Sequence, residues 1–270
     1  MPKAQSEFLT QLYADQKDVP HAALNAQPRN PKPVFAHPRR AQSLVRTLVA
    51  VLVIAVILAV GIHGGQRHYL LTSLLLMGTA FGAVCLRFER RHPTARELVV
   101  IAVLVALAVA GRSAFFMLAQ FKPIAAVVIV SGVAFGSDVG FLVGALSALT
   151  SNIFFTQGPW TPWQMLGFGC IGWLAGWLAW HNFLRPNRIS LAIFGFFSVI
   201  LVYGGIMNPA SIIMYGGVVN KMTLLAIYLS GFPMDLVHAS ATVLFLVVLG
   251  IPVLRKLARV QTKYGVFTER

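Results

Sequence analysis

The sequence predicts an all-α, polytopic membrane bundle of eight spans, in which an extra two-helix hairpin precedes a six-span core. Of the 270 residues, 57% are hydrophobic and only 11% are charged, whereas soluble domains carry about 25% charged residues. Several apolar runs reach the roughly 20 residues that a spanning helix needs. These observations exclude an ordinary soluble enzyme, a disordered protein and a nucleic-acid-binding domain, even though the net charge of +14 could suggest nucleic acid.

The N-terminal part is predicted to hold a tail, a hairpin and a linker. Residues 1–43 are polar and rich in proline, so we expect a disordered, basic cytoplasmic tail and no signal peptide. The apolar runs Leu44–Ile62 and Tyr69–Leu86 form the extra transmembrane hairpin, residues 44–86. Residues 87–97 are strongly charged and are expected to form a basic cytoplasmic linker.

Six further apolar runs define the core, residues 98–254, which a basic cytoplasmic tail (255–270) follows. The runs are Leu98–Gly111, Pro123–Phe135, Val139–Phe155, Trp163–Trp180, Ile189–Ile206 and Met234–Ile251. The region Met207–Phe232 is apolar but broken by glycine, proline and asparagine. We interpret it as a long outer loop that folds back onto the bundle. A ninth span is the alternative, but it would place the basic C-terminal tail outside.

The basic residues indicate the orientation in the membrane. With eight spans, eighteen of the 22 lysine and arginine residues lie on one side, which the positive-inside rule identifies as cytoplasmic. The exceptions are Arg67, Arg112, Lys122 and Lys221. We therefore expect both termini in the cytoplasm.

Small residues at four-residue spacing predict close helix contacts, because lipid gives helices no hydrophobic reason to associate. The stripes are Ala102, Ala106 and Ala110; Gly140, Gly144 and Ala148; and Gly172 and Gly176.

Motifs for nucleotide, metal or cofactor chemistry are missing. The chain has no Walker A sequence and no HExxH motif, and Cys85 and Cys170 lie in apolar runs, where free cysteine packs as a small hydrophobe. No span holds paired carboxylates, which argues against a proton- or sodium-coupled secondary transporter. We expect no metal and no cofactor.

Three motifs in the core carry a resemblance to a known family. The Ala102/Ala106/Ala110 helix leads into an outer loop at residues 111–117, and a Gly- and Asp-containing inner turn lies within residues 135–145. A run of polar and aromatic residues, including Gln-Gly-Pro-Trp-Thr-Pro-Trp-Gln, follows at 151–165. This pattern resembles the substrate-binding S-components of energy-coupling factor (ECF) vitamin transporters, most of all the cobalamin and corrinoid branch. The resemblance extends from Glu97 to the C-terminus.

The resemblance implies a non-enzymatic function in the plasma membrane of a prokaryote. An S-component captures a vitamin, here best a corrinoid, at its outer face. It then docks on a transmembrane coupling subunit driven by two cytoplasmic ATPases and releases the ligand inside. The family's docking face falls on Ala102 and Ala106, with Ala110 at its margin. The lipid bilayer is a partner, and nucleic acid is not.

Residues near the outer ends of the core helices are candidates for binding the ligand. Arg112 could pair with a phosphate or carboxylate, or extend to lipid headgroups. The aromatic residues could stack on a ring or anchor the membrane interface, and the amides could bind the ligand or cap helices. Asp235 and His238 share a face at the start of the last predicted span, where the helix dipole alone could account for the aspartate. The full set is Arg112, Phe115, Phe116, Asn152, Thr156, Gln157, Trp160, Trp163, Gln164, Tyr203, Asn208, Asp235 and His238.

Two other functions remain open at this point. One is an S-component for another vitamin or precursor. The other is an integral membrane enzyme acting on a lipid or isoprenoid, for which Asp138, Arg185 and Arg188 would make a sparse catalytic group.

Overall fold

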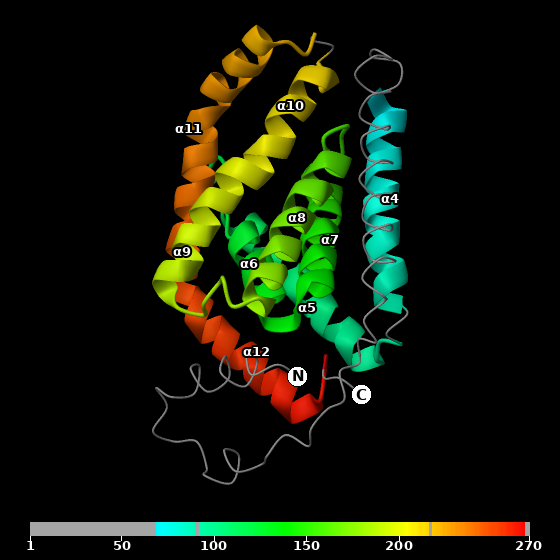
Figure 1. The fold of residues 1–270 in the computed structure, drawn as a ribbon, viewed down its shortest axis with the longest axis vertical. Helices are drawn as coiled ribbons and strands as arrows, with labels where there is room; N and C mark the ends of the chain where they lie inside the picture. The colour runs from blue at the N-terminus through cyan, green and yellow to red at the C-terminus, as the bar shows by residue number, and fades with distance from the viewer. Residues whose placement is uncertain (1–68, 90–91, 216–217, 268–270) are drawn as a thin grey trace.

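The computed structural model describes residues 69–89, 92–215 and 218–267. The predicted tail 1–43 and first span Leu44–Ile62 lie outside these ranges. All secondary structure in the described residues is helical, and the chain passes back and forth along one bundle (Figure 1). The helices are α4 (Tyr69–Glu89), α5 (Ala95–Ala114), α6 (Ile124–Phe135), α7 (Ser137–Phe155), α8 (Thr161–Trp180), α9 (Arg188–Phe197), α10 (Gly204–Met214), α11 (Lys221–Phe245) and α12 (Ile251–Tyr264).

Two pairs of these helices are continuous through π-helical segments. The segment η2 (Ser198–Tyr203) joins α9 to α10, and η3 (Leu246–Gly250) joins α11 to α12. Four helical stretches in the described residues are long and apolar enough to cross a membrane, at 95–114, 137–155, 188–214 and 221–264. The structure therefore supports a membrane-spanning helical bundle, while the count of eight spans stays a prediction.

The predicted outer loop at Met207–Phe232 is wrong. Most of this region is helical, because α10 extends to Met214 and α11 begins at Lys221. Asn220 begins α11 by accepting hydrogen bonds from the backbone N–H groups of Met222 and Thr223, both at 2.9 Å. Figure 1 shows α10 and the first half of α11 rising as a helical pair beyond the turn between α7 and α8. No separate ninth span lies in this region.

Glycine contacts hold α6, α7 and α8 together. A Cβ atom at Gly140 would collide with the carbonyl oxygen of Gly172, and one at Gly172 would collide with that of Gly140. Likewise, a Cβ atom at Gly144 would meet the backbone of Phe168. The predicted glycine stripes on α7 and α8 are therefore confirmed as contact surfaces, where the backbones approach each other directly.

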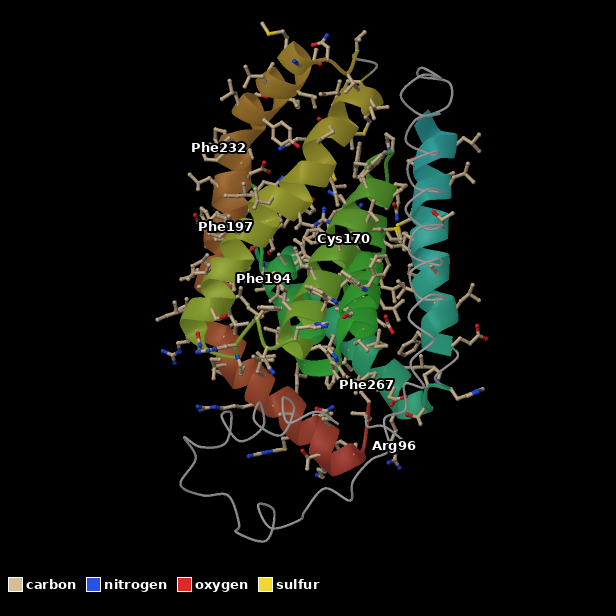
Figure 2. All side chains as sticks on the ribbon, viewed as in Figure 1. Arg96, Cys170, Phe194, Phe197, Phe232 and Phe267 are labelled. Atoms are coloured by element: carbon tan, nitrogen blue, oxygen red, sulfur yellow. The ribbon has the colours of Figure 1, made fainter. Side chains whose placement is uncertain are left out.

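The C-terminal segment after α12 returns to the start of α5. Thr94 and Glu97 form a reciprocal capping box at the N-terminus of α5. The second carboxylate oxygen of Glu97 accepts a hydrogen bond from the backbone N–H of Phe267 at 2.6 Å. The ring of Phe267 packs on Phe135, with the ring centroids 4.6 Å apart. Figure 2 shows Arg96 and Phe267 at this same end of the bundle. Glu97 thus links the first and last helices of the core.

Replacing Glu97 with alanine is expected to destabilise the protein by about 2 kcal/mol, because the helix cap and the bond to Phe267 are both lost. Glu97→Gln keeps one acceptor oxygen, so it can retain only one of the two hydrogen bonds, and it should cost about half as much. Glu89→Ala removes an exposed acid and serves as the control. The measurement is the melting temperature of the purified protein in detergent. Equal losses for Glu97→Ala and Glu97→Gln would contradict this explanation.

Candidate functional site

Arg112 lies in the last turn of α5 and points into the bundle. One of its amino groups donates hydrogen bonds to Ser151 Oγ at 2.6 Å and to Asn152 Oδ1 at 2.8 Å. Both partners are on α7 and have no exposed surface. The guanidinium also lies 5.3 Å from the ring centroid of Phe155, which is within the range of a cation–π contact. An arginine that reached for lipid headgroups would point the other way.

Asn152 connects Arg112 to α8. Its amide nitrogen donates to Thr161 Oγ1 at 2.9 Å and to Gln164 Oε1 at 2.8 Å. The Thr161 hydroxyl in turn donates to Gln157 Oε1 at 2.8 Å. Side chains from α5, α7, the α7–α8 turn and α8 therefore form one hydrogen-bonded group. We call it the Arg112 cluster, and it consists of Arg112, Ser151, Asn152, Gln157, Thr161 and Gln164.

The sequence of the α7–α8 turn explains how this cluster forms. α7 ends at Phe155, and the φ of 92° at the following residue, Thr156, turns the chain. α8 starts with Thr161 and Pro162, because proline is favoured in the first helical turn. A short turn between them keeps the last turn of α7 beside the first turn of α8. Asn152 can therefore reach both Thr161 and Gln164.

An aromatic group adjoins the Arg112 cluster. Tyr203 lies close to Gln164 of α8. The ring of Tyr203 lies 4.5 Å from that of Phe168 and 5.1 Å from that of His238, measured between centroids. Tyr203 ends the π-helical segment η2, and such segments are frequent at functional sites. Tyr203 and His238 are both buried.

A second cation, Lys122, lies near Arg112. Lys122 is in the link between α5 and α6 and is half-buried. Burial lowers the pKa of the Lys122 ammonium, and the positive charge of Arg112 lowers it further. The charges of Lys122 and Arg112 both act on His238 as well. Two cations thus face the same part of the bundle.

Phe115 and Phe116, the two phenylalanines among the predicted ligand-binding residues, pack against other aromatic rings near the end of α5. Phe115 contacts Phe245 edge to face, with the ring centroids 5.2 Å apart. Phe116 stacks on Phe155 at 4.9 Å, and Phe155 is the ring beneath the guanidinium of Arg112. The Phe116–Phe155 stack therefore lies beside the guanidinium of Arg112.

Asn208 and Asp235 form a separate pair. Asn208 Nδ2 donates to Asp235 Oδ2 at 2.9 Å. Asp235 and His238 lie within α11 and well past its start at Lys221, so their predicted position at the beginning of the last span is wrong. The helix dipole at an N-terminus therefore does not explain Asp235.

The remaining predicted ligand-binding residues of the α7–α8 region are not members of the Arg112 cluster. Trp163 is buried against Ala210 and its neighbours on α10. The indole of Trp160 folds over Gly158, where a Cβ atom would collide with it. Thr156 is exposed and serves as the C-cap of α7.

Four residues of this region were not among the sequence candidates: Ser151, Thr161, Lys122 and Phe168. Ser151 adjoins Asn152 in the sequence, and Thr161 lies four residues after Gln157. Lys122 is one of the few basic residues outside the predicted cytoplasmic segments. That exception was the signal that could have identified it.

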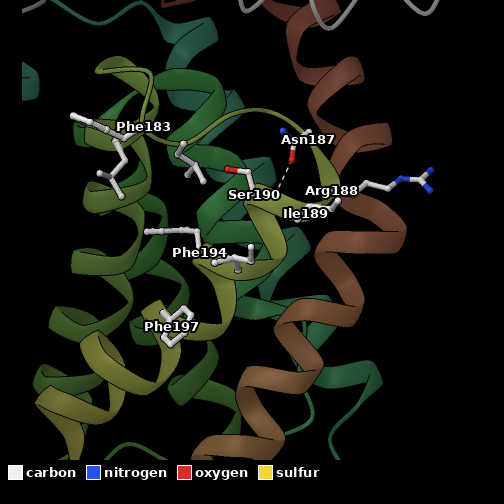
Figure 3. Close-up of a pocket in the computed structure, with 10 residues that line it drawn as sticks. Phe183, Asn187, Arg188, Ile189, Ser190, Phe194 and Phe197 are labelled. Carbon is white, nitrogen blue, oxygen red and sulfur yellow. Dashed lines mark hydrogen bonds between the residues drawn. The ribbon is translucent and has the colours of Figure 1, made fainter.

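Two hollows lie away from the Arg112 cluster. One of about 840 Å³ lies at the α8–α9 link and is lined mainly by apolar side chains such as Phe183, Ile189 and Phe197 (Figure 3). The dashed line in Figure 3 is the hydrogen bond that the backbone N–H of Ser190 donates to the side chain of Asn187, the residue that caps α9. Another, of about 310 Å³, opens between η2 and α11. We base the candidate site on the converging polar side chains, because neither hollow gathers polar groups from several helices.

The outer face of α5 is a second feature of functional interest. Ala102, Ala106 and Ala110 are exposed, and Val99 and Val103 on the same side are each 60% exposed. Leu104 and Ala108 on the opposite side are buried. This alanine stripe therefore contacts no other helix in the described part of the chain.

Comparisons with known proteins agree with this architecture. A family model described as "ECF-type riboflavin transporter, S component" matches residues 93–259, which extend from the start of α5 into α12. A UPF0397 protein of Vibrio atlanticus (strain LGP32) is 31% identical over 125 residues, covering 44% of this chain and 68% of the relative. A UPF0397 protein of Aliivibrio salmonicida (strain LFI1238) is 32% identical over 121 residues, covering 42% and 64%.

No solved structure shows a significant match to the chain. The family match includes the Arg112 cluster and the alanine face of α5, whereas α4 precedes it. Because the matched region makes up more than half of the sequence, the chain belongs to the ECF-type riboflavin transporter S-component family of membrane transporter subunits.

Proposed function

We propose that this protein captures a vitamin or vitamin precursor at the Arg112 cluster and delivers it to the coupling subunit and ATPases of an ECF-type importer. The observation that carries the proposal is the convergence of polar side chains from α5, α7 and α8 beside the Phe168, Tyr203 and His238 rings. Polar groups inside a membrane bundle are costly and mark functional sites. A few polar groups next to aromatic walls are also typical of small-molecule sites.

The distribution of charge supports an outward-facing site. Arg96, Arg185, Arg188 and the basic residues of α12 belong to the end of the bundle where α5 and α9 begin. By the positive-inside rule this end faces the cytoplasm. The Arg112 cluster is at the other end, as capture of an external vitamin requires.

The nature of the ligand is the finer part of the proposal. The family description names riboflavin, so the corrinoid expected from the sequence resemblance is not supported by it. A compact cluster beside three aromatic rings suits a single fused ring system with hydrogen-bonding substituents better than the much larger corrin macrocycle. Riboflavin is therefore the first compound to test, and cobalamin is the second.

Binding to the purified protein tests this proposal. Saturable binding of a vitamin is expected, and Asn152→Ala should weaken it at least about tenfold, because three hydrogen bonds of the cluster depend on that amide. Asn208→Ala is the matched change in the separate Asn208–Asp235 pair and should leave binding within about twofold. If neither riboflavin, cobalamin nor another vitamin binds, the proposed function is wrong. If Asn208→Ala is the more damaging change, the site lies at the Asn208–Asp235 pair.

A further inference from the structure

The positive charge of Arg112 has no acidic partner in the described residues. Its two hydrogen bonds go to neutral oxygens, those of Ser151 and Asn152. Lys122 lies nearby but is a second cation, so it does not neutralise the charge of Arg112. Two like charges in the same partly buried region repel each other, and a bound anion would offset this repulsion.

The four acids among the described residues all lie elsewhere or bond to another residue. Glu89 ends α4, Glu97 caps the start of α5, and Asp138 lies in the first turn of α7. These positions are at the opposite end of the bundle from the last turns of α5 and α7, where Arg112 and Asn152 lie. The fourth, Asp235, accepts its hydrogen bond from Asn208. Within the described ranges, the anion that balances Arg112 and Lys122 is not supplied by the protein.

The contacts of the Arg112 guanidinium fix its orientation, as in a binding site for an anion. Ser151 and Asn152 accept hydrogen bonds from one amino group of Arg112. The guanidinium carbon lies over the ring of Phe155, 5.3 Å from the ring centroid. A guanidinium fixed in this way keeps its fork of N–H donors in a set direction, which favours paired hydrogen bonds to a carboxylate or phosphate.

From this arrangement we infer that the ligand of the Arg112 cluster carries an anionic group, a carboxylate or a phosphate, which Arg112 binds and which the nearby charge of Lys122 attracts. The inference rests on the proposed function. It goes beyond that function because riboflavin itself is uncharged. The ring would occupy the aromatic side near Tyr203, and the acidic group would lie at the guanidinium of Arg112.

Matched pairs of ligands that differ only in the acidic group test the inference. Suitable pairs are riboflavin 5′-phosphate with riboflavin, pantothenate with pantothenol, nicotinate with nicotinamide, and biotin with its methyl ester. In any pair that binds the purified protein, the anionic member should bind about tenfold to a hundredfold more tightly, because a hydrogen bond to a charged group contributes that much. Arg112→Gln and Lys122→Gln should each remove most of this preference.

Two controls separate the possible failures. Lys221→Gln removes an exposed cation at the start of α11 and should leave the preference unchanged. Arg112→Lys keeps the charge and should retain part of the preference, which guards against a folding defect in Arg112→Gln. Equal binding of both members of a pair overturns the inference and leaves the proposed function intact. No binding by any of these pairs, by cobalamin or by another vitamin overturns the proposed function.

A lipid phosphate is the other possible source of the anion. If a lipid occupied the two cations, anionic lipid in nanodiscs would raise the melting temperature of the wild type but not of Arg112→Gln, and the matched ligands would bind equally. That combination would overturn the inference. Unequal binding with no dependence on lipid charge supports it.

Discussion

Substituting alanine for Gly172 is expected to destabilise the protein by about 3 kcal/mol, at the upper end of what overpacking typically costs. The added Cβ atom would collide with the backbone carbonyl of Gly140 and approach Val128 Cγ1 to 2.8 Å. A flexible side chain could move aside, but the backbone of α7 cannot move without separating from α8. A loss of this size should lower the melting temperature of the purified protein by roughly 10 °C.

The control for this prediction is Gly205→Ala, a helical glycine whose Cβ would meet nothing within 4 Å. This change should be neutral or stabilising by about 0.5–1 kcal/mol, because alanine loses less backbone entropy in a helix. Gly140→Ala should reproduce the effect of Gly172→Ala. The double variant should cost less than the sum of the two, since one displacement of α7 from α8 accommodates both methyl groups. Similar melting temperatures for Gly172→Ala and Gly205→Ala would refute the close backbone contact.

The glycine stripes on α7 and α8 are the part of the fold that could be predicted most directly from the sequence. Small residues at four-residue spacing within an apolar run have few purposes in a membrane other than close helix contact. Gly140, Gly144 and Gly172 therefore identified the central α7–α8 contact directly. The same pattern did not distinguish Ala102, Ala106 and Ala110, which are exposed, because spacing alone does not say whether the partner belongs to the same chain.

The outer loop predicted at 207–232 does not form, because the glycine and proline residues of this region do not break its helices. Pro209 and Pro233 both lie inside helices, which is common in membrane bundles because neighbouring groups satisfy the freed carbonyls. A Cβ atom at Gly231 would come within 2.9 Å of Asn208 Oδ1. This glycine therefore lets α10 and α11 approach each other and does not turn the chain.

The members of the candidate site could be predicted more readily than their connections. Arg112, Asn152 and Gln164 were identified because polar residues near span ends are unusual. Their mutual hydrogen bonds depend on the rotation of α5, α7 and α8 about their axes, and a list of residues does not contain that rotation. The nature of the ligand was harder still, because a family resemblance is carried by the scaffold while ligand choice depends on a few side chains.

Introducing phenylalanine at Ala106 is expected to abolish most ATP-dependent uptake while leaving ligand binding intact. This prediction rests on the proposal that the exposed alanine face of α5 docks on the coupling subunit. Ala106 is exposed, whereas Leu104 and Val105 beside it face the interior, so the bulky ring would extend outward and leave the fold unchanged. At the docking surface it would hold the two helices apart, and overpacking of about 1–3 kcal/mol weakens docking about tenfold to a hundredfold.

The same change at Ala83 provides the control, because Ala83 is an exposed alanine on α4, outside the region matched by the family model. Ala83→Phe should retain uptake, and Ala102→Phe should resemble Ala106→Phe. Three measurements are needed on each variant: ligand binding by the isolated subunit, copurification with the coupling subunit, and uptake in vesicles supplied with ATP. Loss of binding with normal copurification would reverse the assignment, since α5 would then serve the ligand through its exposed face. Normal uptake by both Ala102→Phe and Ala106→Phe would move the docking surface to another helix, because a close contact between two small-residue faces leaves no room for either ring.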